Sequence, residues 1–126
     1  MIKTDKQAKI LIVDDDIVSG MILEGYLKHF NYYIHIVDNG ITALKWAKEF
    51  RPDLILLDIM MPKISGFEVC KRLKEDKTTQ DIPILFISSL SDPDSHKKAT
   101  ELGGKGFILK PFNENFVKAY VKLFVA

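Results

Sequence analysis

The sequence predicts a doubly wound α/β fold of the (βα)5 type, with a five-stranded parallel sheet and helices on both faces. Short apolar runs alternate along the chain with segments in which apolar residues recur every three or four positions, as on one face of a helix. Four of the five runs are almost continuously aliphatic, which is typical of parallel strands covered on both faces. Strict alternation of strands and helices requires right-handed crossovers, which place helices on both sides of the sheet.

The expected strands are short. They cover residues 9–13, 33–37, 53–57, 83–87 and 106–110. Only the second run alternates between polar and apolar positions, with His35 between Ile34 and Ile36. Because alternation indicates a strand with one face less covered, we expect the second strand at the edge of the sheet.

Residues that favour helix starts precede the helical segments. The first helix follows Asp16, and the second follows an Asn39-Gly40 turn. Ser65 and Glu68 form a capping box, which places the start of the third helix near Ser65. The apolar faces of the second and third helices then comprise Ala43, Leu44, Ala47 and Phe50, and Gly66, Val69, Cys70 and Leu73.

The last two helices also have recognisable ends. The fourth opens with Asp92 as its cap and Pro93 in its first turn, and it stops at Gly103-Gly104. The fifth follows Asn113 and runs to the C-terminus.

Composition and charge describe an ordinary globular chain. The 126 residues suffice for one domain, and 47% are hydrophobic and 28% charged. The net charge of +1 excludes a general attraction to nucleic acid or to an anionic membrane. A single cysteine, Cys70, excludes an internal disulfide, and no apolar run is long enough for a signal peptide or a membrane span. We therefore expect a cytoplasmic protein without nucleic-acid or membrane partners.

Polar residues collect at the ends of the apolar runs. In chain order they are Asp14-Asp15-Asp16, Asp58, Ser88-Ser89 and Lys110-Pro111. In open α/β sheets the ligand site lies beyond the carboxyl ends of the strands, where the winding reverses. Crowded carboxylates repel one another unless a cation is present, and hard oxygen ligands with room for water favour Mg²⁺. A lysine and a hydroxyl beside such a site suit a phosphoryl group, whose transfer depends on positioning and charge neutralisation.

Four segments, in this order, resemble the response-regulator receiver domain of two-component signalling: ILIVDDD, LILLDIMMP, ILFISS and FILKPF. The resemblance covers about residues 9–124, nearly the whole chain. Each segment alone is a weak signal, whereas four in register at strand ends are highly specific. The resemblance implies a flavodoxin-like fold and a single receiver domain over residues 1–126, with its core at about 9–124.

The resemblance also implies a chemistry. Asp58 would be the phosphoacceptor, taking a phosphoryl group from a sensor histidine kinase or a phosphotransfer protein. Mg²⁺, or Mn²⁺ in its place, would be held by Asp15, Asp58 and the backbone carbonyl of Met60, with Asp14 acting through water. The domain would catalyse only its own phosphorylation and dephosphorylation, so we do not expect an enzyme that acts on other molecules.

The parts of a switch follow from the same resemblance. Ser88 would be the switch hydroxyl, and Lys110, before a cis bond to Pro111, would pair with Asp58 and then with the phosphate. Phe107 matches the switch aromatic, which is often Tyr in the family. Phosphorylation would change the surface made by the fourth helix, the fifth strand and the fifth helix, through which the protein could form a homodimer.

Three positions depart from the usual pattern of the family. Ser88 stands where Thr is commoner, and Met60 and Leu90 occupy the two variable positions that flank the site. Both flanking residues are apolar. Because these positions help to set the access of water in the family, the lifetime of the phosphorylated state stays open.

Other polar and aromatic residues have simpler interpretations. Asp16 is explained as well by a helix cap as by a functional role. The three histidines have no metal-ligand spacing and belong to no strand-end motif, so we expect structural or solvent-exposed roles for His29, His35 and His96. Trp46 and Phe50 are expected to pack in the protein rather than to bind a cofactor.

Two other functions stay open on the sequence alone. A Mg²⁺-dependent aspartyl-phosphate hydrolase of the haloacid dehalogenase type also combines Asp, Ser or Thr, and Lys, but it carries its nucleophile on the first strand and usually has a cap domain. Here the lone acid, Asp58, ends the third run. A scaffold receiver that does not switch normally lacks Asp58, the acid pair or Lys110, and all are present. The apolar end KLFVA favours a piece of a longer protein over a stand-alone regulator, and the cognate kinase cannot be read from the sequence.

Overall fold

The computed structural model describes residues 7–125, so residues 1–6 and 126 of the expected domain lie outside the description. Within this range five strands and five helices alternate. The strands are β1 (Ala8–Val13), β2 (Tyr32–Val37), β3 (Leu54–Asp58), β4 (Ile84–Ser88) and β5 (Gly106–Leu109). The helices are α1 (Ile17–Leu27), α2 (Gly40–Phe50), α3 (Gly66–Glu75), α4 (Pro93–Glu101) and α5 (Glu114–Val125).

The sheet confirms the predicted (βα)5 arrangement. Every strand pair is parallel, and the order across the sheet is β2-β1-β3-β4-β5. β2 lies at an edge, as its alternating pattern predicted. The chain passes from β1 to β2 on one side and then to β3 on the other side of β1, so the winding reverses between β1 and β3. The carboxyl ends of these two strands therefore border the position where such sheets bind ligands.

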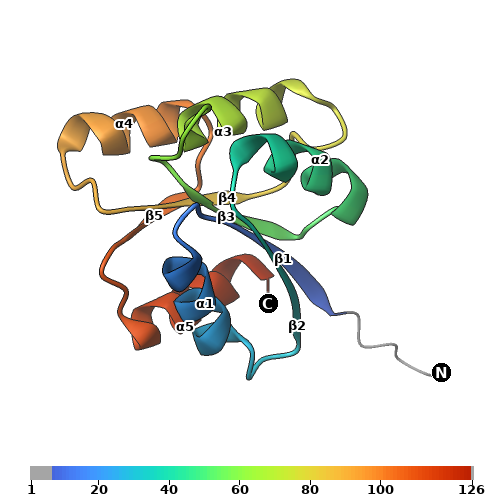
Figure 1. Cartoon of the computed structure of the whole chain (residues 1–126), viewed down its shortest axis with the longest axis vertical. Helices are drawn as coiled ribbons and strands as arrows, with labels where there is room; N and C mark the ends of the chain where they lie inside the picture. The colour runs from blue at the N-terminus through green and yellow to red at the C-terminus, as the bar shows by residue number, and fades with distance from the viewer. Residues whose placement is uncertain (1–6, 126) are drawn as a thin grey trace.

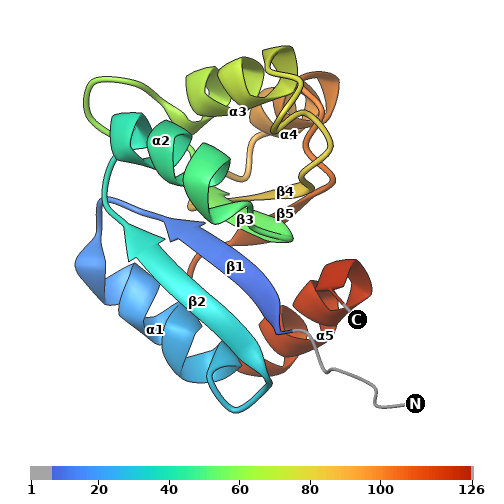
Figure 2. The same cartoon turned by 90° about the vertical axis from the view of Figure 1, so that its right-hand side faces the viewer.

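Two layers of helices cover the sheet. α2, α3 and α4 lie on one face, and α1 and α5 lie on the other (Figures 1 and 2). The core divides accordingly, because successive residues of a strand point to opposite faces. In β3, Ile55 and Leu57 pack with buried residues of α2, α3 and α4, whereas Leu54 and Leu56 pack with those of α1 and α5. No helix within residues 7–125 is long and apolar enough to cross a membrane.

The helix ends agree with the predicted capping residues. The side chains that accept a hydrogen bond from a backbone N–H in the first turn of α1, α2, α3 and α4 are those of Asp16, Asn39, Ser65 and Asp92. The predicted apolar face of α3 is buried at Gly66, Val69, Cys70 and Leu73. α4 ends shortly before Gly103, whose φ of 99° is a conformation that glycine adopts without strain.

The structure shifts several strand ends by one residue. β3 continues to Asp58 because Asp58 pairs with Ile87 of β4, and β4 continues to Ser88 because Ser88 pairs with Leu109 of β5. β5 ends at Leu109, although the N–H of Lys110 still donates to the carbonyl of Ser88 at 2.9 Å. Asp58 and Ser88 are therefore the last residues of β3 and β4, and Lys110 is the first residue after β5.

Candidate functional site at the carboxyl edge of the sheet

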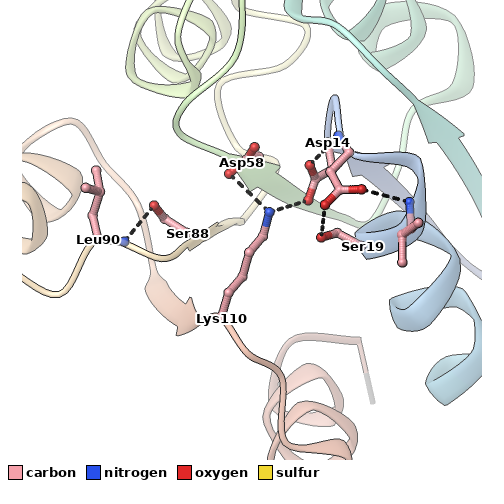
Figure 3. Close-up of polar contacts among 8 residues, drawn as sticks. Asp14, Ser19, Asp58, Ser88, Leu90 and Lys110 are labelled. Carbon is pink, nitrogen blue, oxygen red and sulfur yellow. Dashed lines mark hydrogen bonds and ion pairs between the residues drawn. The ribbon is translucent and has the colours of Figure 1, made fainter.

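Strand geometry decides which functional side chains meet. Residues two positions apart in a strand share a face. Asp14, Asp58 and Lys110 each follow, by two positions, a residue that packs with α1 and α5. Ser88 instead follows Phe86, which packs with the helices of the opposite face. Figure 3 shows the result: the Lys110 side chain reaches from the end of β5 toward the carboxylates of Asp58 and Asp14, while Ser88 contacts the loop that carries Leu90.

Three carboxylates form a compact cluster. Asp14, Asp15 and Asp58 each present an oxygen, and these oxygens lie within 4.8 Å of one another. Asp14 and Asp58 are 0% and 5% exposed, whereas Asp15 is open to solvent. Asp14 Oδ1 accepts a hydrogen bond from the N–H of Asp16 at 2.9 Å, but its buried Oδ2 accepts no well-directed hydrogen bond from residues 7–125. This donor set fits Mg²⁺, which prefers a few carboxylates and retains several waters.

Lys110 supplies the counter-charge. Its Nζ lies 3.0 Å from Asp14 Oδ2 and 3.8 Å from Asp58 Oδ1, so Asp14 rather than Asp58 is the nearer partner. The contact with Asp14 is an ion pair without good hydrogen-bond direction. Burial lowers the pKa of Lys110, but its contact with Asp14 and the charges of Asp58 and Asp14 outweigh this effect and leave the pKa above its ordinary value. Lys110 is therefore a permanent positive charge between the two acids.

Asp58 is costly to ionise in this setting. Burial, followed by the charge of Asp14, raises the pKa of Asp58 from 3.8 to about 7, although Lys110 acts in the opposite direction. A buried carboxylate next to another carboxylate favours the protonated form, and a nearby cation favours the ionised form. A divalent ion at the cluster would consequently favour the ionised carboxylate of Asp58.

Ser88 and Phe107 lie on the α4 side of the sheet. The buried Ser88 accepts a hydrogen bond at Oγ from the N–H of Leu90, at 3.1 Å. Phe107 lies opposite Phe86 in the ladder between β4 and β5. The Phe107 ring is half-buried and stacks on the His96 ring of α4, with centroids 3.8 Å apart and 16° between the planes.

The start of α3 lies against the backbone of the third strand. The N–H of Gly66 donates to the carbonyl of Ile59 at 2.7 Å. A Cβ at Gly66 would overlap the carbonyl oxygen of Asp58. The loop between them carries Met60, which is 62% exposed. The close approach of α3 therefore holds the peptide of Asp58 in place.

The structure brings together the acids and the lysine that the strand-end motifs predicted, and it has a cis bond between Lys110 and Pro111. Asp16 caps α1, the simpler of its two interpretations. The contacts of His96 were not foreseen: its ring stacks on Phe107, and its Nε2 lies 3.3 Å from the carbonyl oxygen of Leu90. No local motif signals these contacts, because they depend on how α4 packs beside β5.

The family model of the response regulator receiver domain matches residues 10–122. The chain belongs to this family. Receiver domains act in two-component signalling, bind Mg²⁺ at an acidic pocket, and interact with histidine kinases or phosphotransfer proteins. The cluster of Asp14, Asp15 and Asp58 agrees with such a pocket.

Individual relatives give the same picture. The chain is 38% identical to the response regulator PleD of Caulobacter vibrioides over 91% of its own length and 25% of PleD. It is 38% identical to the alkaline phosphatase synthesis regulator PhoP of Bacillus subtilis over 90% of its length and 47% of PhoP. It thus spans half or less of these two relatives. The structure of the chemotaxis protein CheY4 of Vibrio cholerae superposes with a TM-score of 0.89 at 28% identity, covering 94% of this chain and 99% of CheY4.

Proposed function

We propose that this receiver domain accepts a phosphoryl group on Asp58 from a histidine kinase or phosphotransfer protein and then changes its α4–β5–α5 surface. The observation that carries the proposal is the position of Asp58: it is buried at the end of β3, within 4.8 Å of two further carboxylates and 3.8 Å from the Lys110 ammonium. Buried acids whose pKa is strongly shifted by burial and by neighbouring charges are concentrated at functional sites, which supports a reaction at Asp58.

The reaction forms one bond and breaks one. A carboxylate oxygen of Asp58 attacks phosphorus, an acyl-phosphate P–O bond forms, and the P–N bond of the donor phosphohistidine breaks. The leaving imidazole keeps the electron pair of that bond and is neutralised by a proton. Asp15, Asp58, the Met60 carbonyl and, through water, Asp14 would hold Mg²⁺ or Mn²⁺, which would supply positive charge to neutralise the phosphoryl oxygens.

The Lys110 ammonium changes its ion-pair partner during the proposed reaction. In the free protein its ammonium pairs mainly with Asp14, 3.0 Å away, and secondarily with Asp58. Once Asp58 carries a phosphoryl group, the strongest negative charge lies on the phosphoryl oxygens, and the flexible lysine gains by turning toward them. Because its pKa is raised, Lys110 remains charged throughout.

Exposed apolar side chains beside the site support docking of a partner. On α1, Ile17, Val18 and Met21 are 63%, 62% and 61% exposed, and they follow directly after the acid cluster. Met60, in the loop that follows Asp58 in the chain, is also exposed, at 62%. An apolar rim around an acidic centre suits a partner that must place a phosphohistidine on Asp58 and then leave.

The experiment is phosphorylation by acetyl phosphate with and without Mg²⁺, followed by intact-protein mass spectrometry. We expect one added phosphoryl group, dependent on Mg²⁺ and removed by hydroxylamine, as for an acyl phosphate. Asp58→Asn should abolish it. Asp53→Asn is the matched control, because Asp53 lies at the opposite end of the same strand, where it accepts a hydrogen bond from Lys9 N–H.

Three outcomes would contradict the proposal in whole or in part. Full phosphorylation of the Asp58→Asn variant would mean that the acceptor is another residue. Repeated turnover of a generic phosphate ester by the wild-type protein would indicate an aspartyl-phosphate hydrolase instead. A protein that is phosphorylated but shows no change beyond the loops around Asp58 would be a receiver that does not switch.

A further inference from the structure

A series of contacts leads from Ser88 to Phe107 through a histidine. The Ser88 Oγ accepts a hydrogen bond from Leu90 N–H at 3.1 Å. The carbonyl oxygen of Leu90 lies 3.3 Å from His96 Nε2, where it can accept a hydrogen bond from the tautomer that carries its hydrogen on this nitrogen. The His96 ring then stacks on Phe107. His96 thus contacts both the loop after β4 and the aromatic residue on β5.

The stack with His96 adds a restraint to the packing of Phe107 against the core. A cavity of about 140 Å³ borders the two rings, with Ala99, Gly104 and Gly106 among its other walls. An aromatic ring beside open space has fewer neighbours that fix its rotamer. The contact with His96, nearly parallel at 3.8 Å, is the close restraint on the Phe107 ring from the α4 side.

We propose that His96 is a positioning residue that acts as a latch, holding Leu90 and Phe107 in the unphosphorylated arrangement and thereby opposing the switch. This inference rests on the proposed function, because the latch resists a change that phosphorylation of Asp58 drives. When Ser88 turns toward a phosphoryl group it leaves the N–H of Leu90, so the loop moves and the Leu90 carbonyl withdraws from His96. The Phe107 ring can then rotate only if the stack also opens.

The latch has a measurable consequence. A contact made only in the unswitched state lowers the population of the switched state, and any ligand that needs the switched state then binds more weakly. Removal of the latch should therefore strengthen binding of a phosphoryl mimic. Because both rings are only half-buried, the low end of the usual contributions of an aromatic pair and a hydrogen bond applies, which suggests a change on the order of three- to tenfold.

The experiment titrates beryllofluoride into the Mg²⁺-loaded protein and follows backbone amides by NMR. We expect His96→Ala to reach half-maximal response at a beryllofluoride concentration three- to tenfold lower than the wild type does, because its switched state is more populated. His96→Gln keeps an N–H donor without a stacking ring, and His96→Phe keeps a ring without the donor. Each of these two variants should have a half-maximal beryllofluoride concentration between those of His96→Ala and the wild type.

A matched control is available in the same chain. His35 stacks on Trp46 with centroids 3.5 Å apart and 22° between the planes, on β2 and far from α4 in the sheet order. His35→Ala removes a comparable stack and should leave the half-maximal concentration unchanged. A second readout needs no mimic: in the metal-free protein, His96→Ala should broaden or shift the Phe107 ring signals and the Leu90 amide.

The outcomes separate the latch from the function on which it rests. If the wild type responds to beryllofluoride but His96→Ala has an equal or higher half-maximal concentration, the latch is wrong and the proposed function stands. An equal gain in His35→Ala would also overturn it, because the effect would then be general loosening. If the wild type shows no response at Asp58, the proposed function fails and the latch fails with it.

Discussion

The burial of Asp58 beside another acid lowers the stability of the folded protein when Asp58 is ionised. It is 5% exposed, faces a second buried acid, and has only the partial compensation of a lysine 3.8 Å away. With its pKa raised to about 7, Asp58 holds a proton in the folded protein at pH values where the unfolded chain has released it. The folded state therefore bears an electrostatic penalty whenever Asp58 is ionised and no metal ion is bound at the cluster.

The penalty makes the stability of the metal-free protein depend on pH. Between 3.8 and about 7, the folded protein binds more protons at Asp58 than the unfolded chain does, so the free energy of unfolding falls as pH rises through this window. Below the window Asp58 contributes nothing, and above it the loss is complete. We expect Asp58→Asn to remove this fall and to stabilise the metal-free protein at about pH 8 by about 1–2 kcal/mol, after allowance for screening.

Urea unfolding with a chelator present, at several pH values, measures this effect. Mg²⁺ should reverse the order of the two proteins, because the ion stabilises the wild-type carboxylates more than the variant. If the wild type and Asp58→Asn lost stability in parallel between about pH 4 and pH 8, another group would be responsible.

At the scale of single residues, the sequence predicted the acids and the lysine but not their distances. Strand-end motifs place Asp14, Asp58 and Lys110 at one edge because parallel strands share their carboxyl ends. That Lys110 lies nearer to Asp14 depends on how the chain leaves β5, which no spacing encodes. The contacts of His96 were not predicted for a similar reason, since its partners come from the loop after β4 and from β5.

Among the elements, α3 and β3 are the pair on which the site most depends. The capping residue Ser65 places the start of α3, and Gly66 then lies so close to β3 that no side chain fits between them. The start of α3 was predictable from Ser65 and Glu68, but the steric reason for Gly66 was not, because it requires the position of a carbonyl in another element. Strand ends differed by one residue for a similar reason, since ladder pairing sets them.

Gly66→Ala tests this contact. The added Cβ would overlap the carbonyl oxygen of Asp58, so α3 or the end of β3 must shift, and we expect a loss of about 1–3 kcal/mol in the free energy of unfolding. Phosphorylation of Asp58 by acetyl phosphate should slow as well, because the peptide of the acceptor moves. Denaturant unfolding and the phosphorylation rate are the two measurements.

Gly25→Ala is the matched control for that substitution. Gly25 lies within α1, where a Cβ would meet no atom of residues 7–125 within 4 Å beyond its chain neighbours and its own helix backbone. Alanine there should stabilise the protein by about 0.5–1 kcal/mol, because it reduces the flexibility of the unfolded chain. If Gly66→Ala were as harmless as Gly25→Ala, the close approach of α3 to Asp58 would not matter.

For the whole molecule, alternation alone was enough to predict a parallel sheet covered on both faces. The order β2-β1-β3-β4-β5 needed the structure, because strand pairing is a long-range property that apolar runs do not encode. This order puts Asp58 in the central strand and β5 at an edge, two strands away. In the proposed function, a signal from Asp58 would therefore cross β4, through Ser88 and its loop, before it reaches the outer surface formed by α4, β5 and α5.

This route predicts which residues respond when a phosphoryl mimic binds at Asp58. Beryllofluoride bound at Asp58 should change amide signals over residues 88–112 and along α5, because contacts connect Ser88 to Phe107 through α4, and a coupling of about 1–3 kcal/mol is typical of such switches.

Apolar side chains are already exposed on this side, with Leu109, Phe116 and Leu123 at 44%, 49% and 75%, so rearrangement should favour self-association. Sedimentation at several concentrations, with and without the mimic, measures that step. Ser88→Ala should weaken both responses while Asp58 is still phosphorylated, and a mimic that left α4, β5 and α5 unchanged would show that the signal does not travel by this route.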